Sequence, residues 1–129
     1  MKTIYLVDDD QDDRYLIRQA LEQTGVPLEV VEAENGLELL SLIQQNEKGS
    51  PALILLDMNM PKMNGLETAL ALKADSRTNA IPIVMISTSS TQALIESAYQ
   101  VGISSFLIKP SSFQEFSSLG GQLAARFLS

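Results

Sequence analysis

Short apolar runs alternate along the chain with longer segments in which apolar residues recur every three or four positions. The short runs are rich in β-branched residues, which is typical of buried strands, and the longer spacing is typical of helices packed on a sheet. A strand followed each time by a helix predicts an α/β domain with one parallel sheet. Five such units fit the sequence, with strands expected at residues 3–8, 28–33, 52–57, 83–87 and 105–108.

Polar residues suited to capping mark where four of the helices begin. Asp10 can cap the first helix, while Asn35 and Asn64 each open the tetrapeptide Asn-Gly-Leu-Glu, which offers a cap and a glutamate three residues later. The last helix begins with Ser112 and Glu115 in the same relation. We interpret the two tetrapeptides as similar helix starts, because a sequence repeat would extend further.

An apolar stripe at helical spacing predicts how the last helix packs. Gly120 and Gly121 interrupt the stripe, and each glycine costs about 1 kcal/mol relative to alanine in a helix. We therefore expect the helix to bend or fray at these two residues. The stripe, interpreted as core, consists of Phe113, Phe116, Leu119, Leu123 and Phe127.

The composition indicates a single domain that binds neither nucleic acid nor a membrane. The 129 residues are the length of one domain, and 45% hydrophobic residues suffice for a core on both faces of a sheet. Because 16 acidic residues outnumber 9 basic ones, the net charge of −7 favours a cation or a basic protein surface as partner. No apolar stretch approaches the roughly 20 residues of a membrane span. We expect a cytoplasmic protein in which residues 1–129 form one domain with no output domain.

The sequence contains no cysteine and no histidine, which excludes several kinds of catalytic group. Without cysteine the chain has no disulfide and no thiolate nucleophile, and without histidine it has no imidazole base and no histidine phosphoacceptor. Any phosphohistidine that takes part in its function must belong to another protein.

Carboxylates cluster directly after the first and third predicted strands. Asp57 ends the third strand and is followed by a loop containing Pro61, which leaves the carboxylate accessible. The carboxyl ends of parallel strands lie at one edge of a sheet, where ligands of open α/β folds bind, so these groups should meet there. We expect a hard-cation site and phosphate chemistry at this edge. The carboxylates after the first strand belong to Asp8, Asp9, Asp10, Asp12 and Asp13.

The fourth and fifth predicted strands add a hydroxyl and an ammonium group to the same edge. Ser87 ends the fourth strand and Lys109 follows the fifth. Phosphoryl transfer to a carboxylate needs such groups, because a nucleophilic Asp57 repels phosphate until a cation neutralises the site. Lys109 and the Ser87 hydroxyl can each hold a phosphate oxygen. The ligands expected for Mg²⁺ are Asp9 and Asp57, with Asp8 behind them and the backbone carbonyl of Asn59 completing the shell.

Four short motifs stand in order at the predicted strand ends, and each alone is a weak signal. They are Leu6-Val7-Asp8-Asp9, Leu56-Asp57-Met58-Asn59-Met60-Pro61 followed by Gly65, Pro82-Ile83-Val84-Met85-Ile86-Ser87, and Phe106-Leu107-Ile108-Lys109-Pro110. Together they resemble the response regulator receiver domain of two-component signalling, nearly end to end. The resemblance implies a flavodoxin-like, doubly wound sheet of five parallel strands in the order 2-1-3-4-5, with five helices.

The resemblance implies a role for each of the candidate site residues. Asp57 would accept a phosphoryl group from the phosphohistidine of a sensor histidine kinase or a phosphotransfer protein. Asp8 and Asp9 would serve the Mg²⁺ site, and Lys109 would pair with the phosphate. A cis peptide bond between Lys109 and Pro110 would aim the lysine inward. The implied switch residues are Ser87, whose hydroxyl follows the phosphoryl group, and Phe106.

Phosphorylation is expected to change a protein-binding surface. Ser87 would move toward the phosphate, Phe106 would turn inward, and the face formed by the last two helices and the fifth strand would change. That face would bind a downstream protein or a second copy of the chain, while the first helix, at residues 14–20, would help to dock the kinase. Ser87 stands where threonine is commoner, so the switch would be coupled less sharply. Beyond Mg²⁺-dependent self-phosphorylation and self-dephosphorylation, the protein would not be an enzyme.

Other interpretations of the same residues stay open. Asp57 could terminate a strand, Asp10 and Asp13 could interact with the dipole of the first helix, and Phe106 could be an ordinary buried aromatic. Lys109-Pro110 could be an ordinary turn.

Three other functions are compatible with the predicted fold class. A flavin-binding protein would place the flavin phosphate against five carboxylates, which repel it. A phosphohydrolase with an aspartyl nucleophile would need a second carboxylate where Asn59 stands. The third is a receiver-like interaction module that is never phosphorylated.

Overall fold

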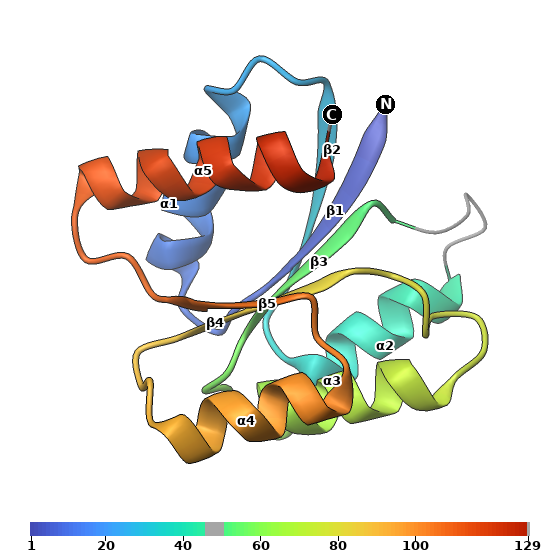
Figure 1. The fold of residues 1–129 in the computed structure, drawn as a ribbon. Coiled ribbons are helices and arrows are strands. Elements are labelled where there is room, and N and C mark those ends of the chain that lie inside the picture. Colours follow the sequence, from blue (N-terminus) through green and yellow to red (C-terminus); the bar gives the residue numbers. More distant parts are fainter. Residues whose placement is uncertain (46–50, 129) are drawn as a thin grey trace.

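The computed structural model describes residues 1–45 and 51–128, which form a parallel sheet covered by helices on both faces (Figure 1). The strand order β2-β1-β3-β4-β5 and the five helices of this part of the chain confirm the predicted flavodoxin-like architecture. None of the described helices is both long enough and apolar enough to cross a bilayer. The strands are β1 (Lys2–Val7), β2 (Leu28–Ala33), β3 (Leu53–Asp57), β4 (Ile83–Ser87) and β5 (Ser105–Ile108), and the helices are α1 (Gln11–Glu22), α2 (Gly36–Gln45), α3 (Gly65–Ala74), α4 (Gln92–Val101) and α5 (Phe113–Phe127).

Both faces of the sheet are covered, which explains the unbroken apolar runs in the sequence. Figure 1 shows α1 and α5 on one face of the sheet and α2, α3 and α4 on the other. In β1, Ile4 and Leu6 join the core cluster on the side of α1 and α5, whereas Tyr5 and Val7 join the cluster on the side of α2, α3 and α4. β3 and β4 are buried at every residue. The central strands are therefore held from both sides, and this packing fixes their carboxyl ends relative to one another.

Side-chain hydrogen bonds confirm the four predicted helix starts. At the start of α1, Oδ1 of Asp10 accepts from the backbone N–H of Asp12 at 2.9 Å and of Asp13 at 3.3 Å. These bonds satisfy backbone donors that a helix leaves free at its first turn. At the starts of α2, α3 and α5, Asn35, Asn64 and Ser112 accept from the backbone N–H groups of Glu38, Glu67 and Glu115 at 2.9, 2.8 and 3.1 Å.

The last helix departs from the sequence prediction in two ways. Phe113 is 67% exposed, so its assignment to the core was wrong: it opens α5, ahead of the turns that pack on the sheet. The helix also does not fray at the two glycines, because α5 runs without interruption from Phe113 to Phe127. The core side of α5 consists of Phe116, Leu119 and Leu123, with Phe127 partly buried beside them.

Close contact between α5 and α1 explains one of the two glycines. A Cβ atom added to Gly120 would lie 2.6 Å from the backbone oxygen of Ala20, which is closer than real Cβ atoms approach. A Cβ atom on Gly121 would meet nothing within 4 Å. Gly120 therefore permits the two helix backbones to approach each other, whereas Gly121 serves no such contact.

We predict opposite effects when each glycine is replaced by alanine. Gly120→Ala should lower the free energy of unfolding by about 1–3 kcal/mol, because overpacking outweighs the gain in helix propensity. Gly121→Ala should raise it by about 0.5–1 kcal/mol, because only the propensity changes. Urea unfolding of both variants measures the difference. Equal stabilisation by the two substitutions would show that α1 and α5 are not in close contact at Gly120.

Candidate functional site

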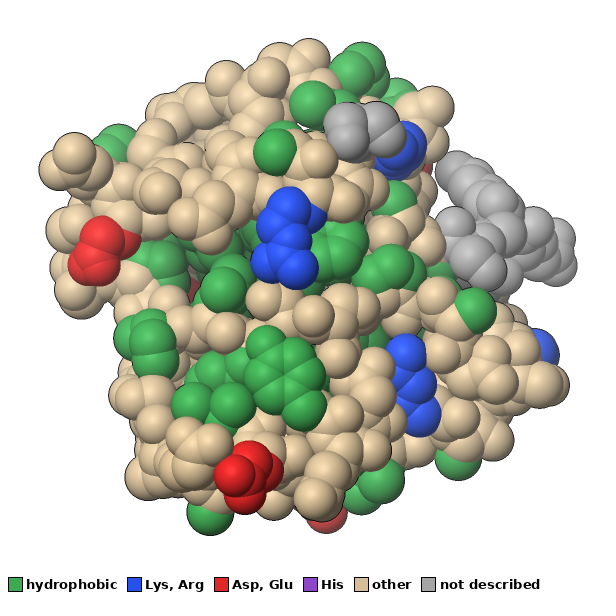
Figure 2. Space-filling view, in the orientation of Figure 1, with side chains coloured by type: hydrophobic (Ala, Val, Ile, Leu, Met, Phe, Trp, Pro, Cys, Tyr) green, Lys and Arg blue, Asp and Glu red, His purple; other side chains and the backbone are tan. Residues whose placement is uncertain are grey.

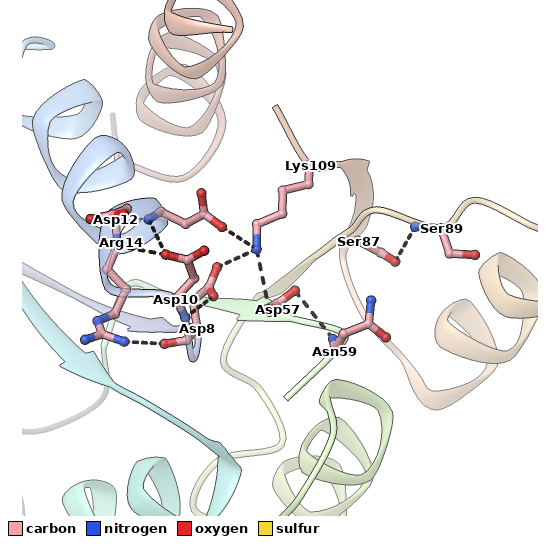
Figure 3. Close-up of polar contacts among 10 residues, drawn as sticks. Asp8, Asp10, Asp12, Arg14, Asp57, Asn59, Ser87, Ser89 and Lys109 are labelled. Atoms are coloured by element: carbon pink, nitrogen blue, oxygen red, sulfur yellow. Dashed lines mark hydrogen bonds and ion pairs between the residues drawn. The ribbon is translucent and has the colours of Figure 1, made fainter. Parts of the chain in front are cut away.

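Four strand ends bring their polar side chains to one edge of the sheet. Asp8 follows β1, Asp57 ends β3, Ser87 ends β4 and Lys109 follows β5. All pairings in the sheet are parallel, so these residues share one edge, and Figure 3 shows Lys109 reaching toward Asp8 and Asp57. Tertiary structure thus assembles residues that are far apart in the chain, as the strand pattern predicted.

Three carboxylates form the acidic part of this site. Each of Asp8, Asp9 and Asp57 offers a carboxylate oxygen, and these oxygens lie within 4.8 Å of one another. Asp8 and Asp57 are buried, with exposed fractions of 2% and 5%, while Asp9 is exposed to solvent. The prediction of an accessible carboxylate at position 57 was therefore wrong, because the residue is buried in this structure. Backbone N–H groups donate to both buried carboxylates: that of Asp10 to Asp8 Oδ1 at 2.9 Å, and that of Asn59 to Asp57 Oδ1 at 3.4 Å.

Lys109 supplies the cationic group of the site. Its Nζ lies 2.7 Å from Oδ2 of Asp13, 3.0 Å from Oδ2 of Asp8 and 3.7 Å from Oδ2 of Asp57. The expected cis bond before Pro110 is absent, because the Lys109-Pro110 peptide is trans. The trans isomer is the ordinary preference of such bonds, and the lysine side chain reaches the carboxylates from it.

Burial and the charges of neighbouring groups shift the pKa values of the ionisable groups in this site. Burial, followed by the negative charge of Asp8, raises the pKa of Asp57 to about 7. Burial also raises the pKa of Asp8. Burial alone would lower the pKa of Lys109, but its hydrogen bonds to Asp13 and Asp8 outweigh that effect and raise the pKa above its ordinary value. Lys109 is therefore a permanent cation beside an excess of carboxylates.

The oxygen donors of this site suit a hard divalent cation. Mg²⁺ prefers oxygen ligands and is usually held by only one or two carboxylates plus water or phosphate oxygens. The close approach of oxygens from Asp8, Asp9 and Asp57 provides such donors, and a cation there would relieve the repulsion that raises the pKa of Asp57. The donor set thus fits the predicted cation.

A glycine lets the loop after Asp57 fold back close to this site. The backbone N–H of Gly65 donates to the carbonyl of Met58 at 2.9 Å. A Cβ atom at Gly65 would lie 2.6 Å from the backbone oxygen of Asp57. The start of α3 therefore packs directly on the backbone that carries Asp57, and residue 65 has to be glycine for this approach. Asn59, whose carbonyl is a predicted ligand, lies in the loop closed by this contact.

The two predicted switch residues lie outside the carboxylate cluster. Ser87 is fully buried, and its hydroxyl accepts a hydrogen bond from the backbone N–H of Ser89 at 3.0 Å (Figure 3). Phe106 is partly buried against the core cluster that includes residues of α2, α3 and α4. Its backbone N–H donates to the hydroxyl of Tyr99 on α4 at 3.0 Å, which links β5 to α4.

Sequence reasoning missed two contacts of the first helix. Asp13 was treated as a residue at the helix N-terminus, but its carboxylate also pairs with Lys109. Arg14 is buried; its guanidinium donates to the backbone oxygen of Asp8 and pairs with Glu32 on β2 at 3.0 Å. The dense run of aspartates before an arginine was the available signal, but their partners follow only from the three-dimensional fold.

A family model and several known proteins match most of this chain in sequence. The family model for the response regulator receiver domain matches residues 4–119. Chemotaxis protein CheY1 of Helicobacter pylori is 34% identical over 107 residues, which are 83% of this chain and 84% of the relative. The probable methanogenesis regulatory protein FilR2 of Methanothrix harundinacea is 33% identical over 115 residues, covering 87% and 74%.

Solved structures of response regulators share this fold. The phosphorylated cyanobacterial phytochrome response regulator RcpA has a TM-score of 0.91 and 32% identity, covering 99% of this chain and 94% of that protein. The Mn²⁺-bound form of response regulator Rcp1 has a TM-score of 0.89 and 26% identity, covering 100% and 96%.

Replacing Asp57 with asparagine should stabilise the metal-free protein at alkaline pH. The folded-state pKa of about 7 exceeds the ordinary value of 3.8, so between these values the folded protein binds more protons than the unfolded chain. The free energy of unfolding of the parent should therefore fall as pH rises from about 4 to about 7, and the variant lacks this fall. We expect the variant to exceed the parent by on the order of 2 kcal/mol at pH 8, with the gap closing near pH 4.

Urea unfolding in EDTA across this pH range measures the gap. Asp75→Asn is the matched control, because Asp75 is a surface carboxylate whose pKa is lowered to about 2 by hydrogen bonds from Arg77. Its removal should give no gain at pH 8. A gap between Asp57→Asn and the parent that stays constant across the pH range would contradict the assigned charge state.

Proposed function

We propose, since this chain belongs to the response regulator receiver domain family, that it is a phosphorylation switch with Asp57 as the phosphoacceptor. The observation that carries this proposal is the placement of the buried Asp57 carboxylate beside Asp8, Asp9 and Lys109. The phosphohistidine of a sensor histidine kinase or a phosphotransfer protein is the donor. The chain is thus a signalling protein whose only chemistry is its own phosphorylation and dephosphorylation.

The transfer step forms one bond and breaks one. An oxygen of the Asp57 carboxylate attacks phosphorus, and the bond between phosphorus and the donor nitrogen breaks, leaving its electron pair on the imidazole of the partner. The product on this chain is an acyl phosphate. Asp8, Asp9, Asp57 and the Asn59 carbonyl would hold Mg²⁺, and the ion would supply positive charge that offsets repulsion between carboxylate and phosphate.

Lys109 and Ser87 receive the phosphoryl group in this proposal. The Lys109 ammonium holds one phosphoryl oxygen as a point charge. The Ser87 hydroxyl gives up the Ser89 backbone N–H and donates to a second oxygen. Phe106 is partly buried against the core cluster that includes residues of α4, and its side chain then turns toward the space that the Ser87 movement opens. Because serine lacks the methyl group of threonine, this coupling is looser than in a receiver with threonine.

The surface expected to change when Ser87 and Phe106 move consists of α4, β5 and α5. Figure 2 shows this face, with hydrophobic side chains gathered between α5 and α4. On this face Ile108 and Tyr99 are exposed by 57% and 47%, and Ile108 lines a pocket together with Leu107, Pro110 and Leu119. We propose that a downstream protein or a second copy of the chain binds here, and that α1 helps to dock the phosphodonor. In this proposal the protein acts in the cytoplasm. Neither a membrane nor a nucleic acid is a direct partner.

Incubation with Mg²⁺ and a small phosphodonor such as phosphoramidate should add one hydroxylamine-sensitive phosphoryl group. Asp57→Ala should abolish the labelling, because it removes the carboxylate that acts as the nucleophile in this proposal. Asp75→Asn should label at the parent rate, and EDTA should prevent labelling of every variant. Intact-protein mass spectrometry measures the adduct. A parent that binds Mg²⁺ but takes no label would favour an interaction module that is never phosphorylated.

Ser87→Ala should separate phosphorylation from switching. The variant keeps Asp57, Lys109 and the carboxylates of Asp8 and Asp9, so its labelling rate should stay within about tenfold of the parent. It lacks the hydroxyl that moves, so the backbone amide signals of α4 and β5 should no longer shift when the protein is labelled. Two-dimensional NMR of labelled and unlabelled protein checks this. Parent-like shifts in Ser87→Ala would remove Ser87 from the switch.

A further inference from the structure

The shortest ion pair of Lys109 is with a residue to which the proposed function gives no task. Oδ2 of Asp13 lies 2.7 Å from Nζ of Lys109, whereas Oδ2 of Asp57 lies 3.7 Å away. The first distance is within the range of a charge-assisted hydrogen bond and the second is beyond it. The ammonium is thus within hydrogen-bond distance of Asp13 and Asp8, and it forms only a longer ion pair with the proposed phosphoacceptor.

The backbone around Asp13 is held in place from two sides. The side chain of Asp10 accepts from the Asp13 backbone N–H at 3.3 Å, which fixes the first turn of α1. The next residue, Arg14, is buried and ties α1 to the backbone of Asp8 and to Glu32 on β2. The backbone position of Asp13 is therefore set by the fold.

We propose that Asp13 is a positioning residue that holds the Lys109 ammonium away from Asp57 until a phosphoryl group draws it off. This inference rests on the proposed function and adds to it a contact that must be broken before the switch is set. The transfer chemistry is unchanged: the bond from Asp57 oxygen to phosphorus forms as the phosphorus–nitrogen bond of the donor breaks. Asp13 acts only on where the ammonium lies before and after this step.

Partial burial gives this ion pair a measurable effect. The side chains of Lys109 and Asp13 are 13% and 23% exposed, so solvent screens their pairing less than it screens a pair on the open surface. The ammonium has three donors, and any donor that stays on Asp13 is not available to a phosphoryl oxygen. Removing the charge of Asp13 should therefore favour every state in which Lys109 contacts the phosphoryl group.

Asp12 provides a matched control for this contact. It lies in the same turn of α1 and carries the same charge, but within the described residues the ion pairs of Lys109 are with Asp8, Asp13 and Asp57. Asp12→Asn therefore reproduces the change in net charge without the loss of an ion pair. Asp13→Glu is a second control, because it keeps the charge at the position that contacts Lys109.

Beryllium trifluoride binds a carboxylate oxygen and imitates a phosphoryl group attached there. It is therefore a suitable probe at saturating Mg²⁺. Asp13→Asn should bind it about three- to tenfold more tightly than the parent and should label about as much faster with phosphoramidate. Asp12→Asn should stay within about twofold of the parent, as through-space charge effects at the surface are small. Asp13→Glu should return both measurements toward the parent values.

A second readout follows the ammonium itself in protein labelled with ¹⁵N-lysine. In the parent, ion pairing should slow proton exchange and keep the Lys109 ammonium signal visible. Asp13→Asn should shift or broaden this signal without any phosphodonor, while Asp12→Asn should not. A purely structural role of Asp13 at the helix start would leave the signal unchanged.

The outcomes separate the positioning role from the proposed function. If the parent takes up phosphoryl groups but Asp13→Asn matches Asp12→Asn in probe affinity and labelling rate, the positioning role is wrong and the switch stands. If the parent takes up neither probe nor label at saturating Mg²⁺, the proposed function is wrong and the positioning role is overturned with it. Tighter probe binding confined to Asp13→Asn, together with a shifted or broadened Lys109 ammonium signal, supports the positioning role.

Discussion

Within the described residues, the buried carboxylates of Asp8 and Asp57 share one ammonium group, that of Lys109, and this imbalance of charge underlies the site. Both carboxylates are almost inaccessible to water, and Lys109 also pairs with Asp13. A buried charge without a full complement of partners is expensive, which is why the pKa of Asp57 is raised. A bound cation would offset this excess of negative charge, which is why the proposed phosphoryl transfer would depend on Mg²⁺.

The fold supplies the framework that maintains this arrangement. β3 and β4 are buried at every residue, so the strand ends that carry Asp57 and Ser87 cannot move apart without exposing core. Gly65 and Gly120 permit close backbone contacts, one beside Asp57 and the other between α1 and α5. By contrast, the Ser87 hydroxyl accepts one hydrogen bond from the Ser89 backbone N–H, which the proposed switch would exchange for a bond to the phosphoryl group. Rigid strand ends beside exchangeable contacts are what a local switch requires.

Much of the fold could be predicted because the periodicity of apolar residues fixes both the element types and the edge at which the strands end. The resemblance to a family added the strand order. The contacts that escaped prediction depend on side chains reaching across elements: Asp13 to Lys109, and Gly120 to the Ala20 backbone. Phe113 was misassigned to the core because helical spacing does not show where a helix extends past the sheet it covers.

The titration of the Asp57 carboxyl group, followed by ¹³C NMR with and without Mg²⁺, tests the charge imbalance most directly. In EDTA its pKa should lie near 7, well above the ordinary 3.8, and saturating Mg²⁺ should lower it substantially. An ordinary pKa in EDTA, or a raised pKa that Mg²⁺ leaves unchanged, would contradict a cation-dependent site at this edge of the sheet.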